Sequence, residues 1–111
     1  MIKVGIIGAS FARDAYLPAL SYIEEAEVVA LASSRIESAR KAAEPYGIAA
    51  VYDDWQAMLD AHDLDLVCIA TPTVMHAPMT LAALAHGAHV LCEKPTAMNA
   101  GEAKDMLDAA E

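Results

Sequence analysis

The run from Ile2 to Ile7, together with Gly8, constrains the fold of this chain more than any other stretch. Almost every residue in the run is apolar, and polar and apolar side chains do not alternate. This pattern is typical of a central strand in a parallel sheet, buried on both faces. Gly8 then lets the backbone turn without a Cβ in the way. A helix that starts there would offer free N–H groups to an anion, commonly the phosphates of a dinucleotide.

The glycine fingerprint of a dinucleotide site is incomplete. The pattern Gly-x-Gly-x-x-Gly, counted from Gly8, meets Ser10 and Arg13 at its second and third glycines. The Ser10 hydroxyl can donate to a phosphate, but Arg13 cannot permit the close contact between helix and strand that a third glycine allows. An ordinary buried strand followed by a turn therefore explains this stretch equally well.

Length and charge exclude several classes of protein. A chain of 111 residues forms one domain at most, and a net charge of −9 argues against nucleic acid and against an anionic membrane surface as partners. The hydrophobic fraction is 57%, yet the apolar runs are too short to span a membrane and no secretory signal is visible. We therefore expect a soluble, cytoplasmic protein.

The sequence predicts no metal site. The four histidines do not follow a metal-binding spacing among themselves or with the cysteines. Cys68 and Cys92 both lie inside apolar runs and are expected to be buried free thiols.

Strands and helices are expected to alternate along the whole chain. Strands are predicted at 2–7, 27–32, 48–52, 65–70 and 88–92, and helices at 14–24, 35–46, 54–59, 75–86 and 100–111. This alternation predicts an α/β fold with a doubly wound parallel sheet of the Rossmann type. Because crossovers are right-handed and a switch point lies beside the first strand, we expect the strand order 3-2-1-4-5.

Several helix boundaries carry their own signals. Ser34 and Asn99 are each followed three residues later by glutamate, the spacing of a capping box, so each is expected to cap a helix. An aspartate at position 53 or 54 is expected to do the same. Pro18 lies inside the first predicted helix and predicts a kink or a restart there.

The chain resembles the N-terminal domain of the Gfo/Idh/MocA family of oxidoreductases, named after glucose-fructose oxidoreductase, inositol dehydrogenase and rhizopine catabolism. The resemblance rests on residues 4–8 with 17–20, on 69–72 with His76, and on 89–95. The Glu-Lys-Pro at 93–95 is the most specific of these. The resemblance implies that residues 1–111 form one Rossmann domain that binds NAD or NADP. In full-length members it also implies a following α+β substrate domain, which this sequence does not include.

The resemblance also implies roles for individual residues. Lys94 would be catalytic, reaching both the nicotinamide ribose and the substrate hydroxyl. Glu93 would bond a ribose hydroxyl, and His76 would lie near the nicotinamide half. The residues expected at the cofactor are Gly8, Ser10, Phe11, Ala12, Ser33, Ser34, Arg35, Thr71, Pro72, Thr73, His76, Glu93, Lys94 and Pro95.

Simpler interpretations of these residues stay open. Residues 93–95 could form a charged surface turn, in which Pro95 only blocks further strand pairing. Thr73 could have no role beyond capping the next helix, and His76 could be a partly exposed surface histidine.

The residues after the second strand bear on the choice of cofactor. An acidic residue there would bind the adenosine 2′-hydroxyl and select NAD. This chain has Ser33, Ser34 and Arg35 instead. Two hydroxyls and a guanidinium suit a 2′-phosphate, so NADP is the expected preference, with NAD as the alternative. In the competing interpretation Ser34 only caps a helix and Arg35 is solvated.

We therefore expect the nucleotide-binding domain of an oxidoreductase that transfers hydride between a nicotinamide and a sugar, polyol or related alcohol. The chain by itself is expected to bind cofactor without turnover, because hydride transfer needs a held substrate. The alternatives are a non-catalytic nucleotide-binding or sensing module and a domain that binds S-adenosylmethionine. The missing acidic residue at 33–35 counts against the last of these. The high apolar fraction also suggests a face that meets another domain or a second copy, as in a homo-oligomer.

Overall fold

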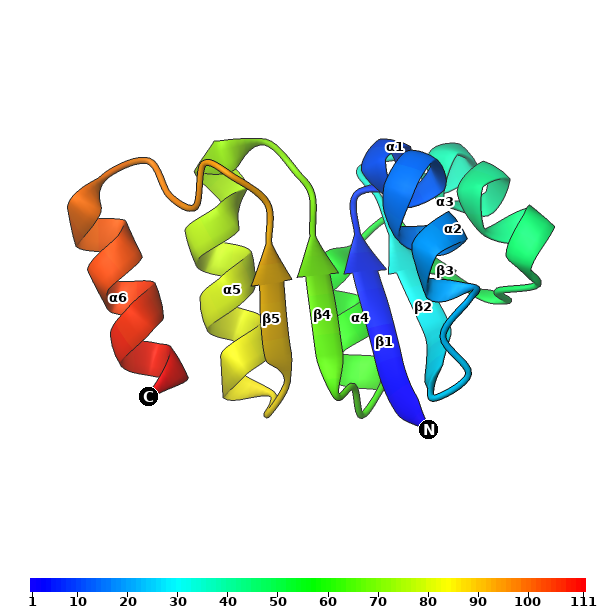
Figure 1. Ribbon diagram of the computed structural model, residues 1–111. Helices are drawn as coiled ribbons and strands as arrows, with labels where there is room; N and C mark the ends of the chain where they lie inside the picture. Colours follow the sequence, from blue (N-terminus) through cyan, green and yellow to red (C-terminus); the bar gives the residue numbers. More distant parts are fainter.

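A computed structural model describes all residues from 1 to 111 as a parallel sheet with helices on both faces (Figure 1). The strands are β1 (Ile2–Ile7), β2 (Ala26–Ala32), β3 (Ala50–Tyr52), β4 (Leu66–Ile69) and β5 (His89–Cys92). They lie in the order β3-β2-β1-β4-β5, and every neighbouring pair is parallel. The predicted fold class and strand order are therefore confirmed.

The helical segments connect these strands. They are α1 (Ala9–Phe11), a π-helical turn η1 (Ala12–Tyr16), α2 (Leu17–Leu20), α3 (Ile36–Ala43), a 3₁₀ turn η2 (Glu44–Tyr46), α4 (Trp55–Ala61), a 3₁₀ turn η3 (Thr73–Met75), α5 (His76–Ala85) and α6 (Ala100–Ala110). No helix of the structure combines the length and the apolar character that crossing a bilayer requires.

Two apolar cores form, one on each face of the sheet. Val4 and Ile6 are fully buried and belong to the core shared with the helices at 9–20 and with α3. Ile7 and Val67 belong to the other core, under α4 and α5. Successive strand side chains alternate between the two faces, so the apolar stretch from Val4 to Ile7 is buried on both.

The first helix begins earlier than predicted. It starts at Ala9 rather than at 14 and ends at Leu20, and its first backbone bond runs from the Ala12 N–H to the Gly8 carbonyl (3.3 Å). The segment widens into the π-helical turn η1 and then restarts as α2, with Pro18 in the first turn. The expected restart is confirmed, since proline has no N–H to give to a helix interior.

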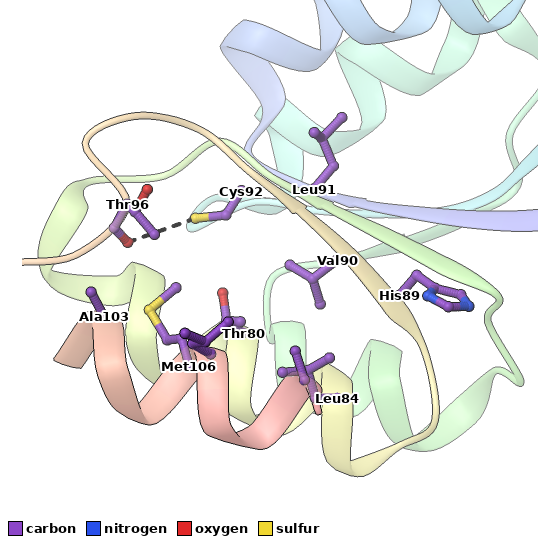
Figure 2. A pocket seen from close by; sticks show the side chains of 11 residues that line it. Thr80, Leu84, His89, Val90, Leu91, Cys92, Thr96, Ala103 and Met106 are labelled. Carbon is purple, nitrogen blue, oxygen red and sulfur yellow. Dashed lines mark hydrogen bonds between the residues drawn. The ribbon is translucent and has the colours of Figure 1, made fainter.

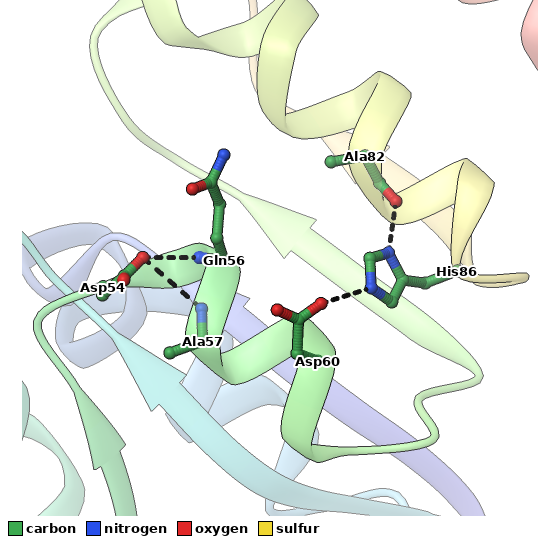
Figure 3. Close-up of polar contacts among 6 residues, drawn as sticks. All are labelled: Asp54, Gln56, Ala57, Asp60, Ala82 and His86. Carbon is green, nitrogen blue, oxygen red and sulfur yellow. Dashed lines mark hydrogen bonds and ion pairs between the residues drawn. The ribbon is translucent and has the colours of Figure 1, made fainter.

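Two predicted helix caps are confirmed. Asp54 Oδ1 accepts hydrogen bonds from the N–H groups of Gln56 (3.0 Å) and Ala57 (3.4 Å) at the start of α4 (Figure 3). Asn99 Oδ1 accepts from the Glu102 N–H (2.9 Å) at the start of α6. Each cap satisfies an N–H group that has no partner within its helix.

The cap predicted at Ser34 is wrong. The helix α3 begins at Ile36, so the cap position falls on Arg35, and no side chain accepts a hydrogen bond there. Ser34 lies two residues before the first residue of the helix, and its hydroxyl is free for another role. Two further expectations also need correction. Cys68 is buried as predicted, but Cys92 is only half-buried, and β3 starts at Ala50 rather than at 48.

The helix α6 lies at the outer end of the sheet, beyond α5 and beside the edge strand β5 (Figure 1). A mostly apolar groove of about 540 Å³ runs between these elements, as Figure 2 shows for Thr80, Cys92 and Met106. The hydroxyl of Thr80 is buried there without a hydrogen-bond partner.

An ion pair joins the C-terminal ends of α4 and α5, which cover the same face of the sheet. The Nε2 of His86, just after α5, lies 2.9 Å from Oδ1 of Asp60 in α4 (Figure 3). The other ring nitrogen, Nδ1, lies 2.8 Å from the Ala82 carbonyl oxygen.

Candidate dinucleotide-binding site

The strand β1 has different neighbours on its two sides, and they diverge where it ends. The Gly8 N–H donates to the Ala32 carbonyl of β2 (2.9 Å), and the Ala70 N–H donates to the Ile7 carbonyl from the β4 side (2.9 Å). The chain leaves β1 for β2 in one direction and only later reaches β4 in the other. Such a switch point opens a crevice at the carboxyl ends of the strands.

Gly8 is required at this point for two reasons. Its φ is +117°, a region that other residues rarely adopt, and a Cβ at this position would collide with the carbonyl oxygen of Ala70. The absence of a side chain therefore lets the turn after β1 pass directly against the end of β4.

A cavity of about 620 Å³ opens at this switch point, within the range of small-molecule sites. The loops after four strands supply its walls. The residues that line it are Ile7, Gly8, Ala9, Ser10, Ser33, Ser34, Ser38, Asp53, Trp55, Ala70, Thr71, Pro72, Met75 and Met79.

The cavity brings together only part of the residue set predicted at the cofactor. Those that line it are Gly8, Ser10, Ser33, Ser34, Thr71 and Pro72. Those that do not are Phe11, Ala12, Arg35, Thr73, His76, Glu93, Lys94 and Pro95. Ala12 is fully buried in the core, whereas Phe11 is exposed and packs edge-on against Tyr16, with ring centroids 5.1 Å apart.

Several lining residues were not predicted. Ser38 lies in α3, four residues after Ser34, but Ser34 is outside the helix, so no helical spacing indicated that both hydroxyls would line the cavity. Asp53 and Trp55 follow β3 directly, and the rule that ligands bind at the carboxyl ends of strands could have found them. Met75 and Met79 carried no signal, because apolar side chains at helical spacing fit any core.

The polar atoms of the cavity are mainly hydroxyls. Serine and threonine side chains line it from three loops, and Asp53 is its one ionisable residue. The N–H groups of Ala9, Ser10 and Phe11 precede the first hydrogen bond of their helix and so have no helical acceptor. Hydroxyl and N–H donors beside a Gly8 turn suit phosphate oxygens, so the donor set fits a nucleotide.

Glu93, which follows β5, is held by a hydrogen bond from Tyr16 in η1. The Tyr16 hydroxyl donates a 2.8 Å hydrogen bond to Oε2 of Glu93, and the Glu93 N–H donates to the Ile69 carbonyl (2.9 Å). Burial, followed by this hydrogen bond and the charge of Glu93, raises the pKa of Tyr16 above its ordinary range. The hydroxyl therefore keeps its proton and remains a donor.

His76 is buried rather than partly exposed, with 1% of its surface accessible. Its Nδ1 lies 2.8 Å from the Pro95 carbonyl oxygen, and its Nε2 lies 2.8 Å from the Thr71 carbonyl oxygen. Lys94, by contrast, is exposed and makes no hydrogen bond or ion pair. The interpretation of His76 as a surface histidine is therefore wrong.

Residues 2–111 match the model of the oxidoreductase family with an NAD-binding Rossmann fold, Gfo/Idh/MocA. The chain belongs to this family. It is 43% identical to D-glucoside 3-dehydrogenase of Escherichia coli, with 98% of this chain and 31% of that protein aligned. It is 35% identical to the NADP(+)-dependent scyllo-inositol 2-dehydrogenase of Bacillus subtilis, with 100% of this chain and 34% of that protein aligned.

Solved structures of relatives carry both forms of the cofactor. A 3-ketoreductase from Actinomadura kijaniata, in complex with NADP and TDP-benzene, superposes with a TM-score of 0.90 at 35% identity, over 98% of this chain and 34% of that one. An oxidoreductase from Agrobacterium radiobacter, in complex with NAD+, L-tartaric acid and magnesium, gives 0.92 at 26% identity, over 98% and 32%. This chain is therefore an NAD(P)-binding Rossmann domain, and it spans about a third of the length of these relatives.

Proposed function

We propose that this chain is the nucleotide-binding part of an oxidoreductase that transfers hydride between a nicotinamide and a carbon of a sugar, polyol or related alcohol. The observation that carries the proposal is the hydroxyl-lined cavity at the switch point beside Gly8, in a member of this family. Relatives named for D-glucosides and scyllo-inositol support the substrate class.

Each part of the cavity has a task in this proposal. The turn at Gly8 and the Ser10 hydroxyl would hold the pyrophosphate, because N–H and O–H donors face an anion there. The loop with Thr71 and Pro72 would line the path toward the nicotinamide. When bound, the cofactor would supply the hydride acceptor or donor, and the residues of this chain would supply position and a route for the proton.

Lys94 is the residue proposed to act in the chemistry. It follows β5 at the carboxyl edge of the sheet, and its ammonium is free of any partner. An ammonium beside the substrate oxygen would stabilise the negative charge that develops there as hydride moves, and it would help relay the proton. Glu93, already oriented by Tyr16 through one oxygen, keeps its other oxygen for a ribose hydroxyl.

NADP(H) is the proposed preference. Ser33 and Ser34 line the cavity where the adenosine ribose would lie, and Arg35 follows on the same exposed loop. A guanidinium suits a 2′-phosphate, whereas the Asp53 carboxylate in the same wall favours the free hydroxyls of NAD. The loss of the Ser34 cap supports the phosphate role, since the hydroxyl has no task in the helix.

One titration tests the proposal. Trp55 is the only tryptophan and lines the cavity, so its fluorescence reports directly on occupancy. NADPH is expected to quench it saturably and at lower concentration than NADH, and S-adenosylmethionine is expected to have no effect. Saturable binding of S-adenosylmethionine, or no response to either dinucleotide in fluorescence and calorimetry, would contradict the proposal.

The same chain is expected to bind without turnover. Hydride transfer requires the reacting atoms to be held about 3–3.5 Å apart, and this chain spans only about a third of the length of its relatives. Robust reduction of NADP or NAD by the isolated chain with a sugar or polyol would favour a complete catalytic site within these residues. The turnover of a Lys94→Ala variant distinguishes an enzyme domain from a dinucleotide-binding module that regulates without catalysis.

A further inference from the structure

The loop that carries Lys94 is held by few contacts. The last backbone hydrogen bond to β4 is the one that the Glu93 N–H donates. Beyond it, the only hydrogen bond of 3.0 Å or less to residues 94–97 is the contact between His76 and the Pro95 carbonyl. The Cys92 thiol approaches the Thr96 carbonyl only at 3.9 Å. Without His76, the position of Lys94 would rest on the flanking strand and on α6 alone.

His76 connects this loop to the wall of the cavity. It occupies the first position of α5, and its ring is fully enclosed between two chain segments. One segment contains Thr71, which lines the cavity, and the other contains Pro95, the residue directly after Lys94. The two contacts leave neither ring nitrogen free for a cofactor or a substrate.

The chemistry of the two contacts requires donors on the ring. A carbonyl oxygen only accepts, so each contact is a hydrogen bond when the facing nitrogen carries a proton. A neutral ring satisfies one carbonyl, and a protonated ring satisfies both. Because the ring is enclosed, each nitrogen faces only its own carbonyl, and the hydrogen bond to the Pro95 carbonyl forms when Nδ1 carries a proton.

We propose that His76 is a positioning residue that fixes the peptide carrying Lys94 against the wall of the dinucleotide cavity. This rests on the proposed function for the task of Lys94, but the contacts themselves do not depend on it. His76 then acts through the loop at 93–95 and not by touching the cofactor, which was the role expected from the sequence.

Three variants of the chain separate this role from general stability. His76→Leu removes both contacts. His76→Asn places an amide nitrogen near the position of Nδ1 and can still reach the Pro95 carbonyl. His76→Gln places one near Nε2 and reaches only the Thr71 side. The Asn variant is therefore the rescue, and the Gln variant is its matched control.

The first measurement is the backbone order parameter of the loop by NMR. In the unchanged chain the amides of Lys94, Thr96 and Ala97 are expected near about 0.85, the value of rigid backbone. In the Leu and Gln variants they are expected to fall below about 0.6 while those of Ile6 and Val67 hold, and the Asn variant is expected to keep them high. Equal loop order in all variants, or equal loss in Asn and Gln, overturns the proposal. If the Leu variant unfolds, the Asn and Gln pair decides the question by the same criterion.

The second measurement compares NADPH with 2′,5′-ADP, which lacks the nicotinamide half. The Gln variant is expected to bind NADPH about five-fold more weakly, the equivalent of one net hydrogen bond, and to bind 2′,5′-ADP unchanged. Equal weakening of both ligands overturns the positioning role. If the unchanged chain binds neither ligand, the proposed function fails, and the order parameters still decide whether His76 holds the loop.

Discussion

The hydroxyl of Tyr16 and the carboxylate of Glu93 lie 2.8 Å apart, although the two residues are 77 positions apart in the chain. The contact joins the helix after β1, where phosphate would bind, to the loop after β5 that carries Lys94. The two ends of the proposed site are thus linked by a side-chain hydrogen bond in addition to the sheet.

Tyr16→Phe is expected to lower the free energy of unfolding by about 1–2 kcal/mol. The change removes one hydrogen bond to a charged acceptor and keeps the ring that packs on Phe11. Urea unfolding measures the change, and Tyr22→Phe is the matched control because Tyr22 is 88% exposed and its hydroxyl makes no hydrogen bond. Equal stability of the two variants would mean that the contact with Glu93 contributes nothing.

Gly8→Ala is expected to cost at least about 2 kcal/mol and to abolish dinucleotide binding. The new Cβ would sit in a backbone region almost closed to L-residues and would meet the Ala70 carbonyl. Gly47→Ala is the control, since Gly47 has φ +69° with nothing within 4 Å of an added Cβ, and it should cost only about 1–2 kcal/mol. A Gly8→Ala chain that unfolds at the same urea concentration and binds NADPH normally would contradict the proposed crevice.

Arg35→Ala is expected to weaken NADPH binding about tenfold and to leave NADH binding unchanged. A guanidinium paired with a 2′-phosphate contributes a charge-assisted hydrogen bond that NADH cannot make. Arg40→Ala removes the same charge from an exposed position inside α3 and serves as the control. If both variants weaken NADPH alike, the effect is one of net charge and the preference does not depend on Arg35.

Lys94→Ala is expected to lower turnover by about 10²-fold while cofactor affinity is retained. Turnover can be measured in a chimera in which residues 1–111 replace the matching part of the Escherichia coli D-glucoside 3-dehydrogenase, with a D-glucoside as substrate. Lys104→Ala is the control, because Lys104 is exposed and pairs only with Asp108 (2.9 Å). Turnover close to that of the parent chimera would make Lys94 a surface residue.

Asp60→Asn is expected to destabilise the fold slightly, and only toward lower pH. The Ala82 carbonyl first, and then the Asp60 carboxylate, raise the pKa of His86 above its ordinary value of 6.5 (Figure 3). A raised folded-state pKa adds stability that is fully present below 6.5 and is lost as the pH rises through the folded-state value. Because the pair is exposed to solvent, its contribution is about 0.2–1 kcal/mol.

The measurement for this ion pair is the urea midpoint at about pH 5.5 and about pH 8.5, on either side of the His86 transition. The difference between the unchanged chain and Asp60→Asn is expected at the lower pH only. Asp63→Asn, nearby and unpaired, should show no such pH dependence. A difference of equal size at both pH values would count against the assignment to His86.

The strand order and the switch point could be predicted because they depend on patterns that lie along the chain. The apolar residues from Val4 to Ile7 before Gly8 indicate burial on both faces, and Asp54 and Asn99 act within one helical turn of their own positions. Ser34 shows the limit of such local rules. A capping-box spacing was present, but the helix began at Ile36 and the serine joined the cavity.

The contacts that hold the site together could not be predicted. The bond from Tyr16 to Glu93 and the two contacts of His76 join segments that meet only after the sheet has formed. A tyrosine at helical spacing carries no sign of its distant partner. The specific stretches at 69–72 and 93–95 located the region correctly in the chain, but they could not show that His76 would bridge them.

The wide turn η1 fixes the direction in which Tyr16 points. In a regular α-helix each residue advances by about 100°, so one residue more or fewer between Gly8 and Pro18 rotates everything after it by that angle. The π-helical turn at Ala12–Tyr16 accommodates an extra residue, which is how the Tyr16 hydroxyl comes to face Glu93. A single-residue deletion within 12–15 would therefore leave a better-formed helix and turn the phenol away from the carboxylate.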